Sequence, residues 1–272
     1  MPNYQAVSFS VHGQQCWRRY TNYAFASRDA VAALTMQEVV KAAMSLPLGF
    51  VPEGESFTLV AVQGLASGSN VLVGPDGRWR AAYIPAVYRS YPFQLAKAQE
   101  GQTVLCVDVD SGLLLDSSAT VAQQGAEAFF VEGAPAPAVQ QVMQFLQTVA
   151  ADRLRTAQVC AHVQALELLE VWPIVLKTEQ GEQRVEGLYR ISEARFNALP
   201  ADALKSLQDS GGLALAVCQL LSMQHLSLLA ELARQQLTQA AGATPGGLTV
   251  NSKGELDLEF LHQADTLNFG NL

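Results

Sequence analysis

The sequence predicts an α+β protein with a strand-rich N-terminal half, a helix-rich C-terminal half and a flexible C-terminal tail. Short alternating apolar and polar runs separated by glycine-rich turns fill the first half. Longer runs with apolar residues at helical spacing fill the second half, and glycine, proline and serine interrupt the chain after Gln239. We therefore divide the chain into residues 1–134, residues 135–240, packed with the first as one unit, and a linker and extended tail over residues 241–272.

Three segments of the first half indicate strands. The runs YQAVSFS, from Tyr4, and TVLCVDV, from Thr103, alternate or are rich in β-branched residues, as is FTLVAVQGL, from Phe57. The run NVLVGPDGRWRAAYIPA, from Asn70, predicts a hairpin, because an apolar strand enters the turn cluster Gly-Pro-Asp-Gly and an aromatic strand leaves it. We expect the aromatic side of this hairpin to pack inward.

One helix is expected to interrupt these strands. Thr35 with Glu38 three residues later forms a capping-box pattern, and Pro47 ends the segment. The apolar residues near a 3.6-residue period should form its buried stripe; they are Val39, Val40, Ala43 and Met44.

The second half indicates helices joined by one hairpin. A long amphipathic helix is expected over 138–169, a hairpin around Gly181, and helical turns beginning at Ser192 or Pro200. The run 212–239 is apolar on most faces, which is typical of a central helix or of one packed against a partner. In the tail, the alternating ELDLEFL could add a strand to a sheet edge of this molecule or of another.

Composition narrows the classes of function. Charged residues make up 15% of the 272 residues and the net charge is −8, so the chain lacks the basic footprint of a nucleic-acid binder. It has no run of 18 apolar residues and no signal-peptide pattern, so we expect no membrane span and a cytoplasmic location. A homo-oligomer is possible, because apolar patches on a surface so poor in charge often mark partner contacts.

Local motifs for catalysis and metal binding are missing from the sequence. The four cysteines and four histidines show no ligand spacing, so we expect no metal and reduced, structural cysteines. Patterns for a nucleophile elbow, a P-loop or a dinucleotide fold are also absent, and we expect no cofactor. Asp108 and Asp110 lie two residues apart, which fits either a cation or acid–base pair or the solvated end of a strand with Asp110 capping the turn.

The densest stretch of aromatic and arginine residues is GRWRAAYIPAVYRSYPF, from Gly77 to Phe93. Such residues either form binding hot spots or fill a core while arginine bonds to carbonyl groups. In particular, Arg89 between Tyr88 and Tyr91 could be stacked and held there, or else bonded to Asp108 or to backbone carbonyls. The candidate ligand- or partner-binding residues are Trp79, Tyr83, Tyr88, Arg89, Tyr91, Phe93 and Asp108, and none is assigned a catalytic role.

This stretch resembles the SapC family of bacterial proteins. The resemblance rests on Asn70, Asp76, Gly77, Trp79, Tyr83, Pro85, Arg89, Tyr91, Pro92 and Phe93, with LCVDVDSGLL and VEGLYRISEARFNALPADALKSL as flanking segments. It spans about Tyr4 to Arg234. The family name implies a link to surface layers. The resemblance also implies that the protein is a neighbour of flavin-dependent halogenase-like proteins, cupin-like hydroxylase-like proteins and TonB-dependent receptors, as members of the family often look to be. It supplies no catalytic residues, and the label of peptide-transporter permease that some members bear does not fit a chain without a predicted span.

Three functions follow as hypotheses. The first is an accessory or binding protein that recognises a protein or peptide partner through the aromatic and arginine stretch. The second is an enzyme of uncharacterised peptide- or aromatic-modifying chemistry, with a pocket using Asp108, Arg89, Tyr83 or Tyr91. The third is a structural protein of the surface layer. The missing catalytic motifs favour the first, so we lean against an enzyme.

Overall fold

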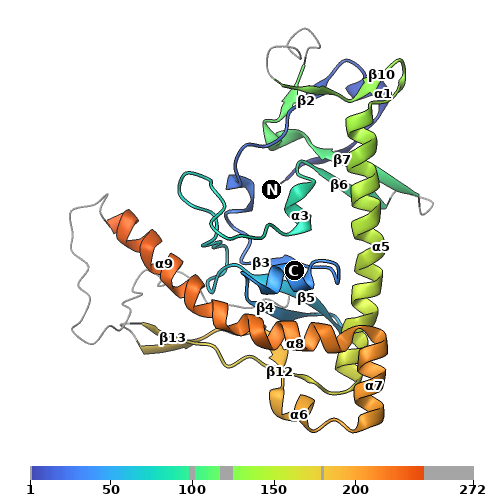
Figure 1. Ribbon diagram of the computed structural model, residues 1–272. Helices are drawn as coiled ribbons and strands as arrows, with labels where there is room; N and C mark the ends of the chain where they lie inside the picture. Colours follow the sequence, from blue (N-terminus) through green and yellow to red (C-terminus); the bar gives the residue numbers. More distant parts are fainter. Residues whose placement is uncertain (1, 98–101, 117–124, 179–180, 242–272) are drawn as a thin grey trace. The chain divides into compact units, whose positions relative to one another are not determined.

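The computed structural model describes residues 2–97, 102–116, 125–178 and 181–241 (Figure 1). Among them, strands dominate the first half and helices the second, so the predicted α+β class is confirmed. The predicted tail lies outside the described residues after Ala241. Contacts divide the chain into two compact units, Met1–Thr21 with Ala86–Asp152 and Asn22–Pro85 with Arg153–Leu272. Each unit therefore combines segments that are distant in the sequence.

The first unit contains short antiparallel sheets. Its elements are β1 (Tyr4–Ala6), α1 (Phe9–His12), β2 (Cys16–Trp17), α3 (Ala86–Arg89), β6 (Phe93–Lys97), β7 (Thr103–Asp108), η3 (Val109–Ser111), β8 (Leu114–Leu115), β9 (Glu127–Ala128), β10 (Phe130–Val131), β11 (Ala134–Pro135) and the start of α5 (Pro137–Ala165). The strand orders are β1-β7-β6, β8-β2-β9 and β10-β11. The strand predicted from Tyr4 ends at Ala6, and the residues that follow form a helical turn instead.

The core of this unit is a row of rings. Trp17 packs edge-on against Phe93 with ring centroids 4.7 Å apart, and Phe93 packs against Phe129 at 5.9 Å. The His12 ring lies 5.1 Å from Phe129 and is fully buried, which lowers its pKa, while its Nδ1 accepts a bond from the N–H of Ser8. Aromatic pairs of this geometry add to the stabilisation from buried area.

The second unit is built on a five-stranded antiparallel sheet with the order β12-β15-β4-β5-β3. Its elements are η1 (Ala24–Ala26), β3 (Val31–Ala33), α2 (Val39–Ala43), β4 (Leu48–Glu53), β5 (Ser56–Val62), β12 (Leu169–Val171), β13 (Val175–Thr178), β14 (Gly181–Arg184), β15 (Tyr189–Ile191), α6 (Glu193–Asn197), α7 (Ala201–Ser210), α8 (Gly212–Ser222), η5 (Met223–His225), α9 (Leu226–Ala241) and the end of α5. The predicted helix starts at Ser192 and Pro200 are confirmed as the caps of α6 and α7.

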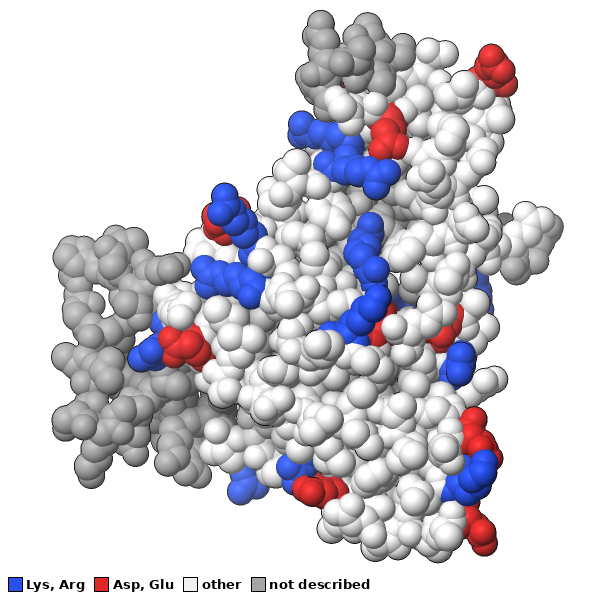
Figure 2. All heavy atoms as spheres, viewed as in Figure 1, with Lys and Arg blue, Asp and Glu red and all other residues white. Residues whose placement is uncertain are grey.

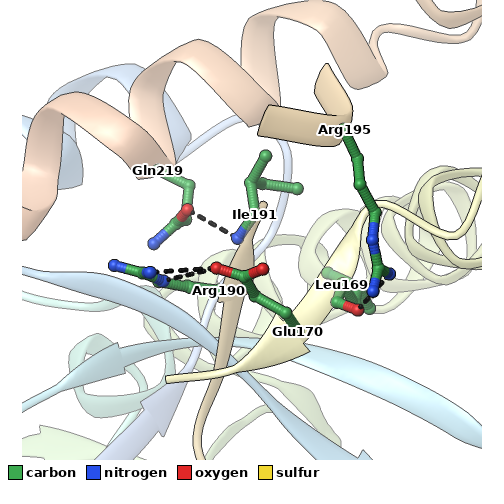
Figure 3. A network of polar contacts seen from close by, with 6 residues as sticks. All are labelled: Leu169, Glu170, Arg190, Ile191, Arg195 and Gln219. Atoms are coloured by element: carbon green, nitrogen blue, oxygen red, sulfur yellow. Dashed lines mark hydrogen bonds and ion pairs between the residues drawn. The ribbon is translucent and has the colours of Figure 1, made fainter. Parts of the chain in front are cut away.

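Helix α8 lies beside β4 (Figure 1) and contacts both β4 and β15. Its polar side chains bond to both strands where the strands do not pair with each other. The strands pair at Tyr189 and Phe50. Beyond that pair, the Gln219 amide donates to the carbonyl of Leu48 at 3.1 Å. The same amide accepts from the N–H of Ile191 at 2.9 Å (Figure 3). Ser222 Oγ accepts from the N–H of Leu48 at 2.9 Å. A glutamine amide thus bridges the two strands as a peptide group would.

An ion pair joins β15 to β12, its neighbour on the side away from β4 (Figure 3). Glu170 and Arg190 are directly opposite in the β12–β15 ladder, with Arg190 Nη2 2.9 Å from Glu170 Oε1. A hydrogen bond from Ser192, followed by those from Arg190, lowers the pKa of Glu170 although burial opposes this effect. Arg195 of α6 donates to the carbonyl of Glu167 at 2.7 Å. These contacts fix the start of α6 to the sheet.

The predicted stripe of α2 is partly wrong. Val39 and Ala42 are buried, whereas Val40 and Met44 are 61% and 77% exposed. The helix is shorter than predicted, since residues 36–38 form a turn, and it presents the Val39 side to the core. The Glu38 half of the predicted capping box is confirmed, because Glu38 Oε2 accepts from the N–H of Thr35 at 3.0 Å.

Candidate functional site

The hairpin predicted from Asn70 lies in the second unit and is confirmed at its turn, whereas its two arms do not form regular strands. Val73 and Trp79 form an antiparallel bridge, and Gly77 donates to the carbonyl of Gly74 at 2.8 Å. Gly77 has a φ of +75°, and a Cβ there would lie 2.9 Å from that of Asn22. Glycine is therefore required at this turn by both backbone and space.

Asn70 ties this hairpin to the rest of the second unit. Its buried amide donates to the carbonyl of Ala26 at 2.9 Å and to Gln63 Oε1 at 2.6 Å, and its Oδ1 accepts from the N–H of Leu72 at 3.0 Å. A buried amide with both ends bonded is well suited to fix a loop. The role of Asn70 is architectural.

Trp79 and Tyr83 also have structural partners. The Trp79 indole donates to the carbonyl of Tyr83 at 2.8 Å, and both side chains pack on the core, as predicted for the aromatic side. The Tyr83 hydroxyl donates to Glu38 Oε1 at 3.0 Å. Glu38 is buried and its other oxygen accepts from the hydroxyl of Thr35 at 2.9 Å. These two candidate site residues thus link the hairpin to the start of α2.

The other candidates lie in the first unit, because the division of the chain falls between Pro85 and Ala86. Tyr88 and Arg89 belong to the helical turn α3, and Tyr88 is buried. Phe93 is part of the ring core described above. Between them, a turn with a cis Tyr91–Pro92 peptide is closed by a bond from the N–H of Phe93 to the carbonyl of Ser90 at 2.7 Å.

Asp108 is buried at the end of β7 and organises its surroundings. Its Oδ1 accepts from the N–H groups of Asn3 at 2.9 Å and of Asp110 at 3.2 Å. Its Oδ2 accepts from the Tyr91 hydroxyl at 3.4 Å. Asp110 lies in η3, so the two carboxylates do not share one face of a strand. Asp108 is the N-cap of η3, whereas the sequence had suggested Asp110 as the capping residue of this turn.

Tyr91 joins this carboxylate to the aromatic surface of the first unit. Burial, followed by the charge of Asp108, raises the pKa of Tyr91 to about 12. Its ring lies 6.2 Å from that of Tyr20. The Tyr91 phenol therefore stays neutral and keeps a fixed direction at ordinary pH.

Arg89 is exposed and lies over an aromatic ring. Its guanidinium carbon is 5.6 Å from the centroid of Phe145 in α5. The sequence suggested stacking between Tyr88 and Tyr91, whereas the ring beneath Arg89 comes from a helix more than 50 residues later. Phe145 was visible in the sequence only as one member of the apolar stripe of that helix.

Other chemistry is sparse in the described part of the chain. No three His, Cys, Asp or Glu side chains lie together there as a metal ion would need. All four cysteines are free thiols, and burial raises the pKa of Cys160 to about 11. The face shown in Figure 2 is largely uncharged, in line with the composition.

Among the described residues, one helical stretch, Gly212–Gln236, is long and apolar enough to cross a membrane. Core helices can have the same length and hydropathy, and α8 buries Leu215, Ala216 and Gln219 within the second unit. The expectation of no membrane span stays an expectation.

The comparisons with known proteins identify a family. The SapC family model matches residues 7–229, so the chain belongs to the SapC family. No curated protein and no solved structure matches the chain.

Proposed function

We propose that this SapC protein is a binding or accessory protein that recognises a protein or peptide partner through the surface around Arg89. The observation on which this proposal rests is that Arg89 is exposed and its guanidinium lies over Phe145. A planar guanidinium that lies over a ring can bind a carboxylate in a two-pronged geometry, and it loses little conformational freedom when it does so. The partner group would be an acidic side chain or a C-terminal carboxylate.

Neighbouring residues support this proposal. Val87, two residues before Arg89, is 36% exposed, and the Tyr91 hydroxyl donates a hydrogen bond to Asp108. An arginine with nearby aromatic and apolar surface is typical of interface hot spots. The resemblance suggests partners among flavin-dependent halogenase-like proteins or TonB-dependent receptor systems.

The proposal can be tested by placing a photo-crosslinking amino acid at Val87 in the source cells. A crosslinked partner should be lost when Arg89→Glu is added and retained with Arg18→Glu, a matched change at another exposed arginine of the first unit. With the purified partner, Arg89→Lys should weaken binding about tenfold, equivalent to about 1.4 kcal/mol. Because Arg89 is exposed and lysine keeps its charge, the melting temperature should change little.

A second variant tests the support from the ring. Phe145→Leu leaves Arg89 in place but removes the cation–π contact, which contributes roughly 0.5–1 kcal/mol at exposed sites. Binding should then weaken about two- to fivefold. If Arg89→Lys binds as tightly as the unchanged protein, or melts several degrees earlier and still binds, Arg89 has a structural role and the proposed surface is wrong.

A further inference from the structure

A cavity of about 530 Å³ lies within the second unit, against β3, β5, β4 and the part of α5 that follows Asp152. Its lining is mainly apolar and includes Val31 and Ala33 of β3, Val60 of β5 and Leu154 of α5. Leu154 is 71% exposed, so the cavity is bordered by a large apolar side chain that the described part of the unit leaves uncovered. The volume falls in the range of roughly 300–1,000 Å³ that is typical of ligand sites.

Strand β3 borders this cavity and is an open edge of the five-stranded sheet. The N–H of Leu34 bonds to Leu59 and the N–H of Gln63 bonds to Ala30, which fixes the antiparallel ladder with β5. Since ladder bonds alternate along a strand, the N–H and C=O groups of Val31 and Ala33 point away from β5. No described residue makes a hydrogen bond to these four groups.

The edge lacks three of the usual protections against pairing. Natural edge strands are often protected by charged side chains, proline or bulges, whereas β3, although only three residues long, has the sequence Val-Ala-Ala. Its free backbone groups can bind an extended chain, and the cavity beside it can take alternate side chains of that chain. This combination is the geometry of strand addition.

We propose that this edge binds an extended chain by strand addition and that the occupant is residues 255–261 of the same chain. In this segment Leu256, Leu258 and Phe260 alternate with acidic residues. Alternate side chains of a strand point to opposite sides. Pairing with β3 therefore directs the three apolar side chains to the cavity and the three carboxylates to solvent.

The length of the chain permits this docking in the same molecule. Gln236 of α9 donates to the carbonyl of Val73 at 2.9 Å and to that of Val71 at 3.3 Å. The N–H of Val71 bonds to Gln63, which in turn bonds to Ala30, the residue before β3. One glutamine side chain and two strand-like spacings of about 5 Å thus separate Gln236, five residues before the end of α9, from Ala30.

The linker is longer than this distance requires. Residues 242–254 number 13 and span up to about 43 Å when extended. A segment tethered by such a linker has an effective concentration of order mM at the edge. The tail would therefore exclude weakly binding foreign strands, so that the edge is open only to a competitor that binds more tightly.

Hydrogen exchange of single amides in the full-length protein tests the proposal. The amides of Val31 and Ala33 should exchange at least tenfold more slowly than unprotected amides. Leu258→Asp should abolish this protection, whereas Leu267→Asp, a matched change outside the segment, should leave it intact. The amide of Leu34, bonded to Leu59, reports in each variant that the sheet itself is unchanged.

A change in the cavity provides the second arm of the test. Ala157→Trp places a large side chain at an exposed position of the cavity lining and should abolish the same protection. Ala161→Trp, one turn later on the exposed side of α5, should leave it intact. Rapid exchange of Val31 and Ala33 in the unchanged protein would overturn the proposal. Protection that rises with protein concentration would identify a second copy as the occupant and overturn docking within one molecule.

Discussion

Replacing Gln219 by methionine should strongly destabilise the second unit. Methionine has nearly the same shape as glutamine but cannot donate to Leu48 or accept from Ile191. Both residues are fully buried, so the carbonyl of Leu48 and the N–H of Ile191 would lose their partners without access to water. The variant therefore isolates the hydrogen bonds from the packing.

The magnitude follows from these two groups. A buried donor or acceptor left without a partner costs about 1–3 kcal/mol. Two such groups sum to about 2–6 kcal/mol, and burying a thioether in place of an amide offsets part of this. We expect a net loss of about 2–4 kcal/mol in the free energy of unfolding.

Urea denaturation followed by circular dichroism measures this loss. Gln208→Met on the exposed side of α7 is the matched control and should change the free energy of unfolding by less than about 0.5 kcal/mol. A loss below 1 kcal/mol for Gln219→Met would refute the reasoning, because the two strands would then find other partners at this point.

Two further predictions concern tyrosines. In an absorbance titration at 295 nm, Tyr91 should ionise at a pH above that of an ordinary tyrosine, because its pKa is raised to about 12. Its contribution to the free energy of unfolding is therefore complete below pH 10 and is lost as the pH rises towards 12. Tyr91→Phe should remove this late phase, and a difference titration centred near pH 10 would contradict the prediction. Tyr83→Phe should lower the free energy of unfolding by about 1–3 kcal/mol, because it removes a donor from the buried Glu38. A double-mutant cycle with Glu38→Gln should give a coupling of at least 0.5 kcal/mol, and additive losses would show that the bond contributes nothing.

The elements that could be predicted are those with local signals. The turn from Gly74 to Gly77 needs a positive φ at its last residue, and the predicted Ser192 and Pro200 are the N-caps of α6 and α7. The long α5 deviates from the predicted bounds by a few residues. Turns, caps and helical periodicity depend on neighbours in the sequence, so they can be read from it.

The elements that escaped prediction depend on distant partners. β4 is a short apolar run whose pairing with β15 joins Phe50 to Tyr189. The edge strand β3 has only three residues and no alternation of apolar and polar side chains. Nothing local indicated that Val40 and Met44 would be exposed, since both fit the helical period and only the position of the core decides which side is buried.

The candidate site shows the same limit. The sequence identified a dense set of aromatic residues but could not separate those that fill a core from those at the surface. Tyr88 and Phe93 proved to be buried, and Trp79 and Tyr83 bond within their own unit. The ring that supports Arg89 comes from a helix whose proximity no local pattern reveals.

The motif by which the family is recognised is thus explained in large part by folding. Asn70 and Gly77 are required by the hairpin, and Phe93 by the ring core. Such residues would persist in related proteins of any function, so the motif by itself indicates the fold. Arg89 differs from them because its side chain is exposed, and the stability of the fold should tolerate its replacement. If the Arg89→Lys variant melts at the same temperature as the unchanged protein but no longer binds the partner, the motif contains both residues that stabilise the fold and residues that bind. The exposed residues of the motif are then the ones in which function should be sought.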